Sequence, residues 1–289
     1  MKKTILLLIN ANSNDLPLID YAVALAKSHH SFLELFDARW ITHALPLELV
    51  PTNIVEVEEM KHSTNTFEYS EGQMELLCQL VKEKWTLTDY KLARNLMYGH
   101  LPNKRDFWMD EIKNIQPKAI VMRVKNELNI WNEMFGTEET KIAEEANCPV
   151  LLLPKKISVF NPLKTIGYFL DREKSIDEAI IEIQFLSNIS KIHNGELSIY
   201  YFSDAAEKEA KLELAVVRSK LSNAIDFEQM RIRDFSNFYT PKVLNDLVKI
   251  RVNNLIAFPQ REKSFLQRLT DNDNTKRLIL GANIPVLVF

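Results

Sequence analysis

The sequence predicts an α/β fold made of two tandem, open, mostly parallel doubly wound sheets. The phrase Ala-Asn-X-Pro-Val-Leu occurs twice, at residues 146–151 and 282–287. Each half also opens with a continuous apolar run, at residues 4–10 and 165–171. Runs of this kind are typical of strands that are buried on both faces, as in parallel sheets. Strand and helix patterns alternate after each opening run, which favours successive βα units.

The first half reads as a series of such units. In chain order we expect a strand at 4–10, a helix at 16–28, a strand at 31–38, helices at 72–84 and 105–115, a strand at 118–124 and a closing strand within 146–154. His29 and His30 follow the first helix, where cationic side chains are favoured by the helix dipole.

The second half repeats this order with its own helix-start signal. Residues 175–178 have the pattern of a capping box, in which Ser and Glu side chains satisfy the first backbone N–H groups of a helix. The expected elements are a strand at 165–171, a helix at 179–192, a strand at 197–202, helices at 205–223 and 241–250, a strand at 254–258 and a closing strand within 282–289.

The spacing of the repeated features predicts where the halves differ. The opening runs lie 161 positions apart and the closing phrases 136 positions apart, so the first half carries 25 extra residues. We expect an insertion at about 40–71, which is polar and weakly periodic. The boundary falls within 155–163, where a proline interrupts regular structure. The predicted domains are therefore 1–157 and 162–289.

Composition excludes several classes of protein. The chain has 289 residues and a net charge of −3, with no basic block that would suggest a nucleic-acid partner. No stretch is long and apolar enough for a membrane span. The opening run at 5–9 is too short for a signal peptide, and two cysteines give no disulfide framework. We therefore expect a cytoplasmic protein. The six histidines lack ligand spacing, so we expect no metal site.

Glycine is scarce, and this bears on phosphate binding. The sequence contains only six glycines, and no two are spaced as Gly-x-Gly. Glycine-rich loops bind phosphates because bare backbone N–H groups can approach the ligand closely. A standard phosphate-binding loop is therefore absent from the sequence.

Together, the opening strands, the penultimate strand with its following loop and helix, and the closing Ala-x-Cys-Pro-Val-Leu strand resemble the universal stress protein family. The resemblance covers nearly the whole chain as two tandem copies. It implies a nucleotide-binding type of fold, in which the binding members carry Gly-x2-Gly-x9-Gly-(Ser/Thr) between the last two strands. It also implies that the closing strands pair, either within the chain as a pseudo-dimer or between chains as a homodimer.

The resemblance places the motif of the first half at four positions. Arg123 and Asn126 stand in the first two glycine slots, and Gly136 and Thr137 fill the last two. Asn10 stands where many family members have an aspartate that holds the nucleoside. Arg123 is open to two interpretations: it pairs with a phosphate, or it has no ligand. Thr137 equally fits an ordinary helix start, because two glutamates follow it.

The motif of the second half keeps its length but not its chemistry. Pro259 and Glu262 fill the first two slots, and Asn272 and Asp273 replace Gly-(Ser/Thr). Asp171 keeps the nucleoside-binding aspartate of the family, but it belongs to the half with the poorer loop. Neither half therefore has a complete nucleotide site by sequence.

These observations lead to three functional hypotheses. The first is a non-enzymatic stress-type protein that acts by association, with degenerate nucleotide sites and no cofactor. The second is an ATP- or AMP-binding stress protein whose first half keeps a remodelled site. The third is a small-molecule enzyme with a site in the 40–71 insertion, for which the sequence offers no catalytic group.

Overall fold

The structure is a computed structural model of the whole chain. The residues that it describes are 3–9, 16–37, 79, 81–83, 90–92, 112–124, 146–154, 156–171, 174–203, 205–235, 252–259 and 284–289. The predicted helix at 241–250, the insertion at 40–71 and most of the helices at 72–84 and 105–115 lie outside these residues.

The described residues of the first half form five strands and one long helix, of which all but the strand at 90–92 follow the predicted order. They are β1 (Thr4–Ile9), α1 (Leu16–Ser28), β2 (Phe32–Asp37), β3 (Tyr90–Leu92), β4 (Ala119–Val124) and β5 (Val150–Pro154). β1 is buried from Ile5 to Ile9, as its continuous apolar sequence predicts. α1 is apolar on nearly all sides, and ten of its thirteen residues are buried.

The described residues of the second half also form five strands. Its elements are β6 (Thr165–Asp171), α6 (Ile176–Ile192), β7 (Glu196–Phe202), α7 (Glu207–Ala224), β8 (Met230–Asp234), β9 (Leu255–Phe258) and β10 (Val286–Val288). Ser175 is the N-cap residue of α6, but its side chain makes no cap hydrogen bond. The predicted capping box is therefore wrong: the Glu178 carboxylate binds the Lys174 ammonium instead, at 3.0 Å.

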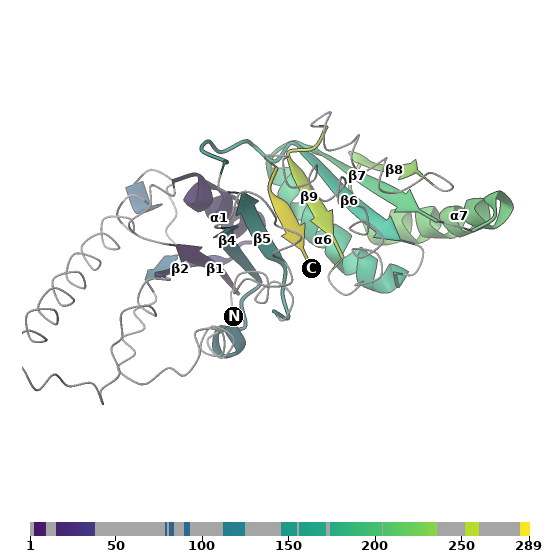
Figure 1. Cartoon of the computed structure of the whole chain (residues 1–289). Helices are drawn as coiled ribbons and strands as arrows, with labels where there is room; N and C mark the ends of the chain where they lie inside the picture. The colour runs from purple at the N-terminus through teal and green to yellow at the C-terminus, as the bar shows by residue number, and fades with distance from the viewer. Residues whose placement is uncertain are drawn as a thin grey trace, which may run out of the picture.

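All ten strands belong to one sheet, in the order β3-β2-β1-β4-β5-β10-β9-β6-β7-β8. From the outer edge to the centre, the first half runs β3-β2-β1-β4-β5 and the second half runs β8-β7-β6-β9-β10. Equivalent strands therefore occupy the same places in the two halves. Neighbouring strands are parallel within each half, and only β5 and β10 pair antiparallel. Figure 1 shows these two strands side by side in the middle of the sheet. The α/β, mostly parallel prediction is confirmed, but the two predicted sheets are joined into one.

The register of the central pair is symmetric with respect to the repeated phrase. Leu151 lies opposite Leu287, and these are equivalent positions in the two copies of the phrase. The flanking pairs, Val286 with Leu152 and Val288 with Val150, are related in the same way. An antiparallel pair centred on equivalent residues is the arrangement that a twofold axis produces. The pairing removes the exposed apolar edge that each closing strand would otherwise present.

Two strands were missed by sequence reasoning. β3 and β8 are the outer edges of the sheet, and each is short. β8 has the sequence MRIRD, in which three of the five residues are exposed. Edge strands with charged side chains lack the continuous apolar run that reveals a central strand.

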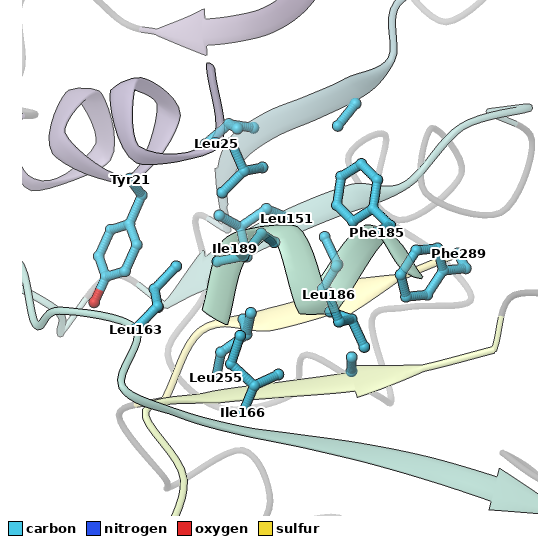
Figure 2. Packing of buried hydrophobic residues seen from close by; sticks show 14 of the residues in the cluster. Tyr21, Leu25, Leu151, Leu163, Ile166, Phe185, Leu186, Ile189, Leu255 and Phe289 are labelled. Carbon is cyan, nitrogen blue, oxygen red and sulfur yellow. The ribbon is translucent and has the colours of Figure 1, made fainter. Parts of the chain in front are cut away.

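The core extends through both halves without a break. Apolar side chains from α1, α6, α7 and one face of the sheet form a single cluster. Figure 2 shows Leu25 of α1 and Ile189 of α6 near Leu151 of β5, and Phe185 beside Phe289 at the chain end. Residues of the opposite sheet face, such as Leu152, are also buried. The halves therefore share one core.

Candidate functional site at the carboxyl ends of the strands

Arg123 lies near the carboxyl end of β4, opposite Leu153 of β5. Its Nη1 atom donates hydrogen bonds to the backbone oxygens of Pro154 at 3.1 Å and Ile157 at 3.2 Å. These carbonyls belong to the end of β5 and the start of the segment that connects the halves. A guanidinium has five donors, so these two bonds do not exhaust it. In this structure Arg123 holds the chain that leaves β5.

The connecting segment, residues 156–164, has further anchors in both halves. The backbone N–H of Asn161 donates to the hydroxyl of Tyr21 in α1 at 3.3 Å. The Phe160 ring packs edge-on against Tyr21, with centroids 4.8 Å apart. Ile157 and Leu163 are buried. The segment predicted as a boundary is thus packed against the domains that it connects.

The other predicted site residues cannot be assembled around Arg123. Asn10, Asn126, Gly136 and Thr137 lie outside the described residues. Asp171 is the last residue of β6, and its backbone pairs with Phe202. Arg123 is the penultimate residue of β4 and Asp171 the last residue of β6.

A cluster of charged and polar side chains lies between β6 and α6. The Lys174 ammonium contacts the carboxylates of Glu178 and Glu182, each at 3.0 Å. The hydroxyl of Tyr168 in β6 donates to Glu182 at 2.5 Å. The Lys174 side chain is only 6% exposed and that of Glu182 12%, whereas that of Glu178 is 61% exposed. Sequence reasoning missed this cluster, although Glu182 interrupts an apolar stripe of α6.

The burial of this cluster governs its protonation. Burial raises the pKa of Glu182, while the hydrogen bonds from Tyr168 and Lys174 oppose that rise. Burial alone would lower the pKa of Lys174, but the bonds to the two carboxylates outweigh it and raise the pKa. Lys174 is therefore a cation already engaged by two carboxylates. It is poorly placed to bind the phosphate of a ligand at this end of β6.

A second tyrosine–glutamate pair lies one βα unit further along. The Tyr201 hydroxyl of β7 donates to Glu213 of α7 at 3.0 Å, and Ser203 reaches the same carboxylate at 3.4 Å. Each tyrosine thus ties its strand to the following helix. The recurrence indicates that these pairs fix helix position.

Replacing Tyr168 with phenylalanine is expected to destabilise the protein by about 1–2 kcal/mol, because it leaves the buried Glu182 carboxylate without one donor. Urea unfolding measures this effect. Glu178→Gln is the control, since that carboxylate is mostly exposed and should change stability by less than about 0.5 kcal/mol. Equal losses in the two variants would show that the buried hydrogen bond is not what holds the cluster.

Other reactive groups in the described residues do not form a site. No group of three or more potential metal-ligating His, Cys, Asp or Glu side chains occurs within the described part of the chain. Burial raises the pKa of the Cys148 thiol to about 12, so this cysteine stays protonated and inert. Across the described segments, no helix combines the length and the apolar character needed to cross a membrane.

Comparison with solved structures identifies the fold. The chain is similar to a universal stress protein from Archaeoglobus fulgidus DSM 4304, with a TM-score of 0.63, 15% identity, and coverage of 99% of this chain and 95% of that one. It is also similar to a functionally unknown protein from Pseudomonas aeruginosa PAO1, with a TM-score of 0.60, 13% identity, and coverage of 100% and 92%. The chain therefore has the fold found in a universal stress protein.

The same fold also occurs in a different setting. The cytoplasmic domain of a prokaryotic cation chloride cotransporter matches with a TM-score of 0.57, 12% identity, and coverage of 100% of this chain and 95% of that one. No protein-family model matches the sequence, and a search of curated proteins found no match. At these identities the likeness establishes the fold, and function has to be argued from the residues of the chain.

Proposed function

We propose that this chain is a universal-stress-type protein in which two copies of one α/β unit form a pseudo-dimer within a single chain. The observation that carries the proposal is the sheet: both halves have the same strand order, and β5 pairs with β10 about equivalent residues. A homodimer of single units would need a second chain to cover each closing strand. In the proposed pseudo-dimer of units 1–157 and 162–289, the pairing of β5 with β10 supplies that cover within one chain.

We further propose that the protein acts by association with other macromolecules rather than by catalysis, and that its nucleotide sites are degenerate. Arg123, in the first glycine slot, binds two backbone carbonyls. Lys174, which follows the carboxyl end of β6 in the second half, is neutralised by Glu178 and Glu182. Both features support the interpretation that these two cations stabilise the fold by binding groups of the protein itself rather than a phosphate. The cytoplasm is the compartment that we propose.

The competing candidate is an ATP- or AMP-binding protein that uses Asn10, Arg123, Asn126, Gly136 and Thr137 in the first half. Arg123 favours it in one respect, since its guanidinium lies at the carboxyl end of a parallel strand, where ligands bind in such folds. A phosphate would have to share this guanidinium with Pro154 and Ile157.

Calorimetric titration with MgATP separates the two candidates. We expect no binding heat at about millimolar nucleotide. At that concentration even a weak site, with a binding free energy of only about 4 kcal/mol, would be detected. Arg123→Ala should leave this result unchanged and reduce stability by about 1–2 kcal/mol, because the two carbonyls lose a donor. Arg231→Ala is the control, since this exposed arginine lies on the edge strand β8.

Stoichiometric MgATP binding that Arg123→Ala weakens and Arg231→Ala leaves intact would contradict the proposal of degenerate sites. It would assign a remodelled nucleotide site to the first half. The pseudo-dimer proposal would be unaffected, because it rests on the sheet.

A further inference from the structure

The junction between α1 and α6 contains a buried histidine in an unusual environment. His29 follows α1 and is only 7% exposed. Its ring stacks on Phe185 of α6, with centroids 3.9 Å apart and planes inclined by 27°. Neither ring nitrogen has a hydrogen-bond partner among the described residues. His29 therefore belongs to the contact between the halves, and the cationic helix end predicted for it is wrong.

The second half carries a histidine at the equivalent position. His193 lies 164 positions after His29 and follows α6 in the same way. Both helices end with the same backbone hydrogen bond from an N–H group to the carbonyl five residues earlier. The Ser31 N–H donates to Ala26 at the end of α1, and the Gly195 N–H donates to Ser190 at the end of α6. The residue after each histidine has a positive φ, 49° at His30 and 48° at Asn194. The two helix ends thus correspond residue by residue.

The aromatic neighbours of the two histidines also correspond. Phe185 lies 164 positions after Tyr21, so each half offers one aromatic ring from its first helix. His29 stacks on Phe185 directly. Phe160 of the connecting segment packs against both Tyr21 and His193, with ring centroids 4.8 and 6.2 Å away. The junction therefore has a histidine near each end, and each contacts a phenyl ring.

The surroundings of both imidazoles disfavour a positive charge. Burial, followed by the charges of Lys118 and His30, lowers the pKa of His29 to about 3. Burial also lowers the pKa of His193, whose Nε2 likewise has no partner within the described segments. Lys191, the nearest charged residue before His193, lies over the Phe227 ring, with its Nζ 5.9 Å from the ring centroid.

We propose that the junction of α1 and α6 is a proton-sensitive joint between the two halves, closed while His29 and His193 are neutral and opened when they bind protons. The proposal does not depend on any nucleotide site. Protonation of His29 would place an unpaired charge in a buried contact, and protonation of His193 would charge a half-buried ring whose Nε2 has no partner among the described residues. Both cost more than protonating an exposed histidine.

The direction of the pH effect follows from linkage. In the open joint each histidine regains an ordinary pKa near ~6.5. In the closed joint the pKa of each histidine is lower. The open form therefore binds more protons than the closed form once the pH falls below the ordinary pKa of about 6.5. The closed joint is therefore fully favoured above about pH 6.5 and weakens as the pH falls toward the folded pKa of His29, about 3.

Hydrogen exchange of backbone N–H groups, corrected for intrinsic rates, tests the joint. Between about pH 6.5 and about pH 5, protection in α1 and α6 should fall about tenfold per pH unit for each histidine that is exposed on opening. Protection in the central strands β1 and β6 should fall much less. An equal fall in those strands would show that protons unfold the whole chain, which contradicts a joint.

Two variants and a control isolate the histidines. His29→Phe and His193→Phe keep an aromatic ring but cannot bind a proton, so each should flatten the pH dependence in the two helices. His30→Asn is the control and should keep most of the pH dependence, because His30 is exposed, the equivalent residue of the second half is Asn194, and burial, the largest cause of the lowered pKa of His29, is unchanged. An unchanged fall in the double variant would overturn the proposal.

A direct titration covers the case in which a variant does not fold. The carbon-bound ring protons of His29 in the wild-type protein should show no NMR titration between about pH 7.5 and about pH 5.5, because burial lowers its pKa to about 3. Ordinary titration of His29 in the folded protein would overturn the proposal.

Discussion

Replacing Leu287 with aspartate is expected to destabilise the protein by at least about 4 kcal/mol, enough to leave much of it unfolded. Leu287 lies opposite Leu151 at the centre of the strand pair that joins the halves, and both side chains are completely buried. A carboxylate there has no partner to offset its desolvation. Urea unfolding measures the loss, and a single transition before and after the change would show that both halves unfold together.

The matched control is Leu212→Asp on α7. Leu212 is 65% exposed, so the same change in chemistry should alter stability by less than about 0.5 kcal/mol. If Leu287→Asp were as mild as this control, the closing strand could not lie in the buried centre of the sheet.

Gly195→Ala is expected to cost about 3 kcal/mol, because the added methyl group would collide with backbone rather than with side chains. A Cβ at Gly195 would lie 2.5 Å from the carbonyl oxygen of Lys164. That oxygen accepts the hydrogen bond of the Glu196 N–H at 2.7 Å, which starts β7 beside β6. Relief of the collision would therefore separate the first residues of the two strands.

Gly167→Ala provides the graded comparison. A Cβ at Gly167 would meet the side chains of Asn253 and Tyr200, each at 2.8 Å. Those side chains hydrogen-bond to one another in the core, with 3.1 Å from Asn253 Nδ2 to the Tyr200 hydroxyl. Side chains can shift where backbone cannot, so we expect a smaller loss, about 1–2 kcal/mol. A larger loss at Gly167 than at Gly195 would contradict this ranking.

The central strands could be predicted because burial on both faces leaves a simple signal. β1, β5 and β9 are short apolar runs without alternation, and the structure places each within about one to four residues of its predicted bounds, an ordinary uncertainty at element ends. α1 matches its predicted range fully. The edge strands β3 and β8 were missed because β3 has only three residues and because three of the five residues of β8 are exposed, which removes that signal.

The pairing of the closing strands was also predictable, from the repeated phrase and from the apolar edge that each strand would otherwise leave exposed. The environment of the histidines was not. His29 follows a helix whose sequence gives no sign that its end faces α6. Burial against Phe185, which is distant in the sequence, overrides the local preference for a cation.

The site could be predicted only as a set of sequence positions that match the nucleotide-binding motif of the resembled family. Counting from the closing phrase placed Arg123 near the end of β4, which the structure supports. The count could not reveal its partners, because the carbonyls of Pro154 and Ile157 have no sequence signature. Lys174 and Glu182 were missed because their contact depends on how α6 lies on β6.

The central claim is that β5 and β10 of one chain pair with each other. Nuclear Overhauser contacts between the backbones of Leu151 and Leu287 test it most directly, measured on uniformly labelled protein and on a mixture of differently labelled chains. The account predicts contacts in the uniform sample and no contact between differently labelled chains in the mixture. Contacts that appear between chains, or that are missing altogether, would contradict it.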